Sequence, residues 1–223
     1  ASPPPVLWAE RTSGPRLAGP VHARRLRRRT AGPLVSCGPI RLFGRASGRG
    51  IAGFSMGGCA ALNLALRHPD IFSLCYAQSP GLFDAQGLQD ALPQWNQRFL
   101  AAYGASFAYD LTLPYPHARI PERAGETDQS LLAAWERGFG GWKSKIDYYL
   151  TRKSRLQEIL VTCGEYESYP WIPRGCAHLA ALLAESKIPA KLTKFLWGHE
   201  LTADLLEEHM LPFFNAHFGP AAG

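Results

Sequence analysis

Several features are missing from this 223-residue sequence, and each absence argues against a class of protein. No apolar run approaches the roughly 20 residues that a membrane-spanning helix needs. The start, Ala1-Ser-Pro-Pro-Pro, lacks the charged and then apolar order of a signal peptide. We therefore expect a soluble cytoplasmic protein with no membrane partner. A leader removed ahead of residue 1 would instead make it secreted or periplasmic.

Cysteine is scarce and shows no metal-binding or disulfide pattern. The five cysteines are odd in number and widely spaced, with no Cys-x-x-Cys pair and no histidine at metal-ligand spacing (Cys37, Cys59, Cys75, Cys163, Cys176). We interpret them as reduced, partly buried thiols. We predict no metal site and no organic cofactor.

Lysine is absent from residues 1–48, which instead hold nine arginines and one acidic residue, a net charge of +8. The remaining 175 residues carry 15 basic and 17 acidic side chains, a net charge of −2. An arginine-rich arm can bind nucleic acid or acidic surfaces (Arg24, Arg25, Arg27, Arg28, Arg29). Because no aromatic residues are interleaved with these arginines, we do not expect specific nucleic-acid binding.

The same first segment shows no helical or strand periodicity, and we place a domain boundary near residue 48. Its Arg-, Pro- and Gly-rich composition suggests a truncated or shifted reading frame in a GC-rich gene. We therefore interpret residues 1–48 as non-native or disordered, and residues 49–223 as the folded domain.

From residue 49 onward, strands and helices alternate, which predicts an α/β fold with a mostly parallel sheet flanked by helices. The predicted strands cover residues 50–54, 71–76, 158–163 and 190–197. The predicted helices cover residues 56–68, 130–138, 176–186 and 201–218, the last interrupted near Pro212. Residues 82–153 are less regular and predict an excursion over the sheet, whose Trp135, Trp142 and Tyr148 either line a substrate pocket or belong to the core.

A Gly-x-Ser-x-Gly motif, Gly53-Phe54-Ser55-Met56-Gly57, lies where the first predicted strand gives way to a helix. This is the context in which the motif exposes a nucleophilic serine above the sheet. We expect glycine on both sides of Ser55 because larger side chains would collide with the neighbouring strand and helix. The backbone N–H of Met56, at the helix N-terminus, is a candidate donor to an oxyanion.

A serine hydroxyl needs a base to become a nucleophile, and His199 is the best placed of seven histidines. It follows a predicted strand and precedes a helix, which puts it at the same sheet edge as Ser55. Four others are better explained by capping or packing (His68, His178, His209, His217), and two lie in irregular segments (His22, His117). An acid should follow the preceding strand. There the loop Gly164-Glu165-Tyr166-Glu167 offers Glu167 as the first choice and Glu165 as the alternative.

Residues 49–218 resemble the esterase family of α/β-hydrolases that includes esterase D, S-formylglutathione hydrolase and feruloyl or acetylxylan esterases. The similar segments are Arg49-Gly-Ile-Ala-Gly-Phe-Ser-Met-Gly-Gly-Cys-Ala-Ala-Leu, His68-Pro-Asp-Ile-Phe, Gly164-Glu-Tyr-Glu-Ser-Tyr-Pro-Trp-Ile-Pro-Arg-Gly, and Gly198-His199 followed by Leu211-Pro-Phe-Phe. The resemblance implies an α/β-hydrolase fold with Ser55 as nucleophile, His199 as base and Glu167 where the family usually has Asp. The family's earlier strands and its oxyanion loop, commonly with His-Gly, are not recognisable in residues 1–48.

These observations predict a serine esterase that acts on small-molecule carboxylic esters through an acyl-enzyme, with hydrolysis and acyl transfer both open. The alternative is a truncated or inactive hydrolase remnant that serves as an interaction module with a basic N-terminal arm. Without the family's earlier strands, an exposed sheet edge would favour aggregation or a homodimer.

Overall fold

The computed structural model describes residues 46–121 and 128–218. Its centre is a parallel sheet whose strands are ordered β1 (Gly50–Phe54), β2 (Leu74–Gln78), β3 (Glu158–Gly164) and β4 (Ala190–Phe195). Each strand pairs with the next one along the chain, so every connection crosses over a face of the sheet. The predicted α/β class with a parallel sheet is confirmed. The prediction that residues 1–48 lack strands and form a separate segment lies almost wholly outside the described residues.

Strand β2 is buried on both faces, as expected of an inner parallel strand. Its side chains alternate between two apolar clusters. Cys75 and Ala77 belong to the larger core, whereas Leu74 and Tyr76 pack with Phe213 in a smaller one. The period of two therefore divides the interior into two layers, one on each side of the sheet.

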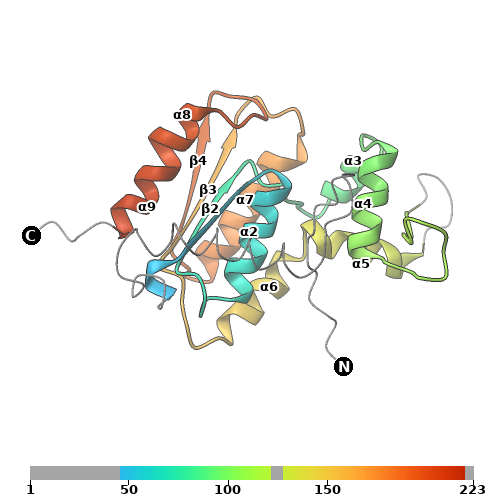
Figure 1. Ribbon diagram of the computed structural model, residues 1–223, viewed down its shortest axis with the longest axis horizontal. Helices are drawn as coiled ribbons and strands as arrows, with labels where there is room; N and C mark the ends of the chain where they lie inside the picture. The colour runs from blue at the N-terminus through green and yellow to red at the C-terminus, as the bar shows by residue number, and fades with distance from the viewer. Residues whose placement is uncertain (1–45, 122–127, 219–223) are drawn as a thin grey trace, which may run out of the picture. The chain divides into compact units, whose positions relative to one another are not determined.

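Helices cover both faces of the sheet (Figure 1). The larger core is covered by α2 (Met56–Arg67), α6 (Trp142–Leu150) and α7 (Trp171–Glu185). The smaller one is covered by α8 (Ala203–Leu205), the π-helical turn η3 (Leu206–Met210) and α9 (Leu211–Phe218). A short 3-10 turn, η2 (Ala46–Gly48), precedes β1. None of the helices in these described stretches is both long and apolar enough to cross a membrane.

The excursion between β2 and β3 is more regular than the sequence predicted. Besides the expected helix, now α5 (Gln129–Phe139), it contains α3 (Gly87–Ala91), α4 (Gln97–Phe107) and α6. The Asn96 side chain caps α4 by accepting hydrogen bonds from two backbone N–H groups, and Asp128 caps α5 in the same way. Such caps contribute about 1 kcal/mol each. The prediction of an irregular segment was wrong, because the aromatic and proline clusters around these short helices obscured their pattern in the sequence.

Two predicted boundaries shift by three residues or more. Strand β2 begins at Leu74 instead of residue 71, because the backbone N–H groups of Ile71 and Phe72 donate to the His68 carbonyl in a turn. Helix α7 begins five residues early, with Pro173 in its first turn, where a missing N–H costs nothing. The last predicted helix is interrupted near Pro212, by the π-helical turn that precedes it.

The four cysteines in the described residues are unpaired and buried (Cys59, Cys75, Cys163, Cys176). Burial raises the pKa of the Cys59 thiol to about 11 and that of Cys75 further. Such thiols are neutral and unreactive at physiological pH. Within residues 46–121 and 128–218, no cluster of His, Cys, Asp or Glu could hold a metal ion. Cys37 lies outside the described residues.

Candidate active site

Ser55 occupies a strained turn between β1 and α2. Its φ of 54° and ψ of −118° are unusual for a residue with a side chain, and such a backbone costs about 1–3 kcal/mol. Three backbone hydrogen bonds hold the turn. The Ser55 N–H donates to the Gln78 carbonyl at 2.9 Å, and the Ser55 carbonyl accepts from Cys59 at 3.1 Å and Gly81 at 3.0 Å. The strain is therefore maintained by β2, by the loop after β2 and by α2 itself.

The glycines around Ser55 are not equivalent. A Cβ on Gly53 would overlap the backbone carbonyl of Gly57, and one on Gly58 would lie 3.0 Å from Pro80 and 3.1 Å from the Gln78 carbonyl oxygen. A Cβ on Gly57 would meet nothing within 4 Å. The expectation that both motif glycines avoid collisions is correct for Gly53 and wrong for Gly57. Close packing instead requires the glycine after the motif, Gly58.

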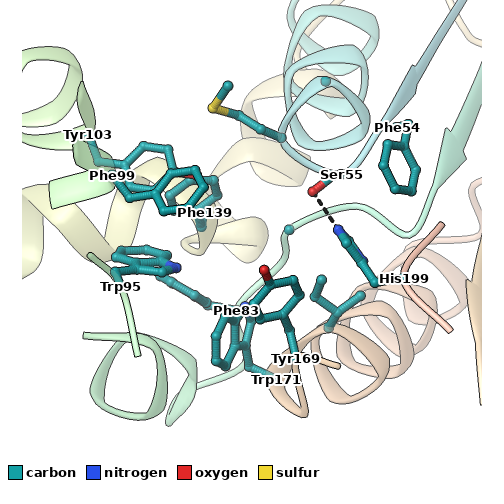
Figure 2. A pocket seen from close by; sticks show the side chains of 14 residues that line it. Phe54, Ser55, Phe83, Trp95, Phe99, Tyr103, Phe139, Tyr169, Trp171 and His199 are labelled. Carbon is teal, nitrogen blue, oxygen red and sulfur yellow. Dashed lines mark hydrogen bonds between the residues drawn. The ribbon is translucent and has the colours of Figure 1, made fainter. Parts of the chain in front are cut away.

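Two hydrogen bonds join Ser55, His199 and Glu167, the three side chains that the sequence predicts to act together. Figure 2 shows the bond between Ser55 and His199. His199 Nε2 lies 2.9 Å from Ser55 Oγ, and His199 Nδ1 lies 2.7 Å from Glu167 Oε2. A carboxylate can only accept, so the bond to Glu167 places the imidazole proton on Nδ1. The Nε2 lone pair is then free to accept the Ser55 hydroxyl proton. The side chains of His199 and Glu167 are 13% and 1% exposed, so this relay is shielded from water.

The loops that carry Glu167 and His199 are tied together. The backbone N–H groups of Glu165 and Tyr166 donate to the carbonyls of Phe195 and Trp197, at 2.7 and 3.0 Å. A Cβ on Gly164 would overlap the Trp197 carbonyl, so glycine permits this close approach. These contacts fix the acid and the histidine relative to each other before any substrate arrives. Glu165 itself is exposed, and Glu167 is the acid that contacts His199.

Two aromatic rings confine the His199 imidazole. Phe54, the last residue of β1, has its ring centroid 4.9 Å from that of His199 with a 35° interplanar angle. Tyr169, from the loop before α7, lies at the same distance with an interplanar angle of 88°. The imidazole therefore has apolar neighbours beside its two polar partners, which limits the rotation that would break either hydrogen bond.

A cavity of about 450 Å³ opens at Ser55 and His199 (Figure 2). Its walls are mainly aromatic and come from the excursion and from the start of α7 (Phe83, Trp95, Phe99, Tyr103, Phe139, Tyr169, Trp171). Burial raises the pKa of the Tyr103 phenol to about 12, with smaller contributions from Cys59 and Tyr169, so this hydroxyl stays protonated. The cavity can enclose a bulky apolar group next to the Ser55 hydroxyl.

Met56 begins α2 directly after Ser55 and also borders the cavity. The N–H groups in the first turn of a helix have no partner within the helix, and the helix dipole makes them attractive to an anion. The predicted oxyanion donor therefore lies at the site, beside Ser55.

A family model described as "Putative esterase" matches residues 42–171, more than half of the chain. The chain belongs to this esterase family. The matched segment contains Ser55, Glu167 and most of the aromatic cavity, and His199 follows it. No curated protein sequence matches this chain.

Two solved structures share the fold of this chain. The chain resembles FphF, a fluorophosphonate-binding serine hydrolase of Staphylococcus aureus, with a TM-score of 0.51 and 14% identity over 89% of this chain and 64% of that one. It resembles the S-formylglutathione hydrolase FrmB of the same organism, with a TM-score of 0.50 and 14% identity over 86% and 61%. A ferulic acid esterase matches at a TM-score of 0.46 and 21% identity, over 79% and 54%. The chain thus spans between about half and two thirds of the length of these proteins.

The other candidate residues lie away from the site. His68 ends α2, His178 lies within α7, and His209 packs on Phe195 with ring centroids 4.3 Å apart. His217 Nε2 lies 3.0 Å from Glu158 on β3. The positions of His68, His209 and His217 agree with the predicted capping and packing roles, whereas His178 is exposed on its helix, so packing does not explain it. His117 contacts the Leu113 carbonyl in the excursion, and His22 and the arginine-rich arm lie outside the described residues.

The cavity-lining aromatics were missed by the sequence reasoning. Trp135 and Trp142 are buried in the core, their indole N–H groups donating to the carbonyls of Arg119 and Phe139, and Tyr148 is half exposed. None of the three lines the cavity at Ser55. The aromatic-rich composition of the excursion was a signal that a cavity would be aromatic. The composition could not indicate which aromatic rings line the cavity, because that depends on contacts between segments that are distant in the chain.

Proposed function

We propose that this protein is a serine esterase in which Ser55 is the nucleophile, His199 the general base and Glu167 the residue that orients it. The single observation that carries the proposal is the pair of hydrogen bonds linking Ser55 Oγ to His199 and His199 to Glu167. In this arrangement a base lies within reach of the hydroxyl proton, and an acceptor fixes the tautomer of the base.

The reaction follows from the positions of these groups. Ser55 Oγ attacks the ester carbonyl carbon while its proton passes to His199 Nε2, and the resulting imidazolium is stabilised by the Glu167 carboxylate. The imidazolium then protonates the departing alcohol, leaving an acyl group on Ser55. Water, deprotonated by His199, attacks this acyl-enzyme, and His199 then returns the proton to Ser55 Oγ as the carboxylic acid is released. The Met56 N–H donates to the oxyanion in both tetrahedral intermediates.

The cavity favours a bulky apolar or aromatic acyl group. Aromatic side chains make up most of its walls, and its volume of about 450 Å³ exceeds what an acetyl group would fill. We therefore expect short p-nitrophenyl esters to be hydrolysed with higher KM than esters carrying an aromatic acyl chain. The proposed substrate is a small-molecule ester.

The alternative, a hydrolase remnant without activity, has no support from the site, where the three side chains are within hydrogen-bonding distance. In an inactive remnant, nothing would require a strained serine, a buried carboxylate and a histidine to be joined by hydrogen bonds. The two hypotheses are separated by whether Ser55 reacts.

The test is covalent labelling of the purified chain with a fluorophosphonate probe, alongside hydrolysis of p-nitrophenyl esters. We expect one label per chain, lost in both Ser55→Ala and His199→Ala. Ser168→Ala, which removes an exposed serine from the acid loop, is the matched control and should label like the parent. Absence of labelling by a chain with a cooperative unfolding transition would reject the proposal in favour of the remnant.

A further inference from the structure

The oxyanion of an acyl-transfer intermediate is usually held by two hydrogen-bond donors, and the Met56 N–H accounts for one. A second donor has to project into the same cavity, near Ser55, with a hydrogen that no protein group already binds. Not every N–H group close to Ser55 has a free hydrogen. The Gly81 N–H, for example, is bonded to the Ser55 carbonyl at 3.0 Å.

The Tyr169 hydroxyl meets both conditions. Tyr169 lines the cavity, and its ring contacts the ring of His199, whose Nε2 lies 2.9 Å from Ser55 Oγ. Figure 2 shows the hydroxyl directed into the cavity, away from the protein that supports the ring. Within the described residues this hydroxyl has no hydrogen-bond partner, whereas the buried indole N–H groups of Trp135 and Trp142 both have one.

The Tyr169 ring is held in place from several directions. Its centroid lies 5.1 Å from that of Trp171 with an interplanar angle of 41°, and the His199 ring contacts it edge to face. Its backbone carbonyl accepts a hydrogen bond from the Ile172 N–H at 3.0 Å, which joins Tyr169 to the first turn of α7. A donor held in this way needs little reorganisation during the reaction, which is the condition under which such donors stabilise a transition state most.

The other phenol in the cavity is less suited to this role. Tyr103 stacks between Phe99 and Phe107, each with its ring centroid 5.9 Å away and nearly parallel. It belongs to α4, in the wall formed by the excursion, and its ring packs on rings of that wall. Tyr169 is the phenol whose ring touches the proposed base.

We propose that the Tyr169 hydroxyl donates a hydrogen bond to the ester carbonyl oxygen as that oxygen becomes negatively charged. The phenol keeps its proton throughout, so no bond to hydrogen is broken at Tyr169. When the intermediate collapses, the carbonyl re-forms and the hydrogen bond weakens. This inference rests on the proposed function, because it needs Ser55 to attack an ester.

The test is Tyr169→Phe, which keeps the ring contacts and removes only the hydroxyl. Loss of one oxyanion donor lowers turnover by about 100- to 1000-fold, so we expect kcat to fall by that factor while KM changes by less than about threefold. Phenylboronic acid, whose tetrahedral adduct with Ser55 mimics the oxyanion, should inhibit the variant at least about tenfold less well. Tyr166→Phe removes an exposed hydroxyl three residues earlier in the same loop, outside the cavity, and is the matched control.

Each outcome decides a distinct question. A Tyr169→Phe variant with kcat and boronate affinity within threefold of the parent would overturn the role of Tyr169 while leaving the esterase proposal intact. A kcat loss that grows with the pKa of the leaving alcohol would also overturn it, because it would place the donor at the leaving group. A parent chain with no Ser55-dependent hydrolysis would mean that the esterase proposal itself has failed.

Discussion

Lys145 on α6 is a buried cation whose replacement should stabilise the protein. Its Nζ is buried without a hydrogen-bond partner in the described residues, and lies 4.2 Å from the centroid of the Trp142 ring. Burial lowers its pKa from 10.5 to about 8, against a smaller opposing effect of Cys59. A decrease of about 2.5 units corresponds to roughly 3 kcal/mol at about 1.36 kcal/mol per unit. This is the free-energy cost, at neutral pH, of burying the charged Lys145 side chain in the folded protein.

Lys145→Met keeps an apolar chain of similar length and removes the charge. We expect the free energy of unfolding at pH 7 to increase by about 1–3 kcal/mol, since replacing a poorly compensated buried charge by an apolar group is often stabilising. The pH dependence should change as well. Between pH 8 and 10.5 the unfolded lysine still holds a proton that the folded one has released, so Lys145 makes the parent more stable as the pH rises. The variant should lack this increase.

The assay is guanidinium chloride unfolding at pH 7 and pH 10, followed by tryptophan fluorescence. Lys143→Met is the matched control, because Lys143 is on the same helix but exposed, 3.2 Å from Asp147, and should change stability by less than about 0.5 kcal/mol. If Lys145→Met were less stable than the parent at pH 7, or kept the parent's rise in stability up to pH 10, then the ammonium is not penalised by burial and the reasoning is wrong.

Two further predictions concern the site. Glu167→Gln should lower kcat by roughly 10³- to 10⁴-fold in the p-nitrophenyl ester assay, because the amide can stabilise the wrong imidazole tautomer. The control Glu165→Gln should keep kcat within about twofold of the parent. Equal losses in the two variants would contradict the assignment of Glu167. Gly53→Ala should lower the free energy of unfolding by roughly 2–4 kcal/mol, because the added Cβ would overlap the Gly57 carbonyl. Gly57→Ala should lower it by less than about 1 kcal/mol, because a Cβ there meets nothing within 4 Å. Thermal denaturation measures both changes, and the reverse order would refute this steric argument.

The sequence could predict the three relay residues because each follows the end of a parallel strand. Ser55 follows β1, Glu167 follows β3 and His199 follows β4, and the register pairs Phe54 with Gln78 and Gly164 with Phe195. The strands therefore end nearly level, at one edge of the sheet. Strand ends and their order are local, periodic signals, so pattern reasoning can find them.

The cavity and Tyr169 could not be predicted in this way. Phe83, Trp95 and Phe139 meet through contacts between segments that are up to 56 positions apart in the chain, with ring centroids 5.2 to 5.9 Å apart. No local period marks such residues. Tyr169 carried a partial signal, since it lies two residues after the predicted acid, but it is distinguished from Tyr166 in the same loop by its place in the cavity and its contact with His199, which the sequence does not reveal.

The longer acid at position 167 is accommodated by the way its side chain is held. The family resemblance implies aspartate there, and glutamate adds one methylene that has to be taken up without moving the carboxylate away from His199. Glu167 Oε1 accepts a hydrogen bond from the Gly164 N–H at 3.3 Å, while Oε2 reaches His199 Nδ1 at 2.7 Å. The side chain therefore turns back on its own loop, and both oxygens are bonded although only 1% of it is exposed. An aspartate on this backbone would be too short to make both bonds, so Glu167→Asp should lower kcat even though it restores the residue more usual in the family.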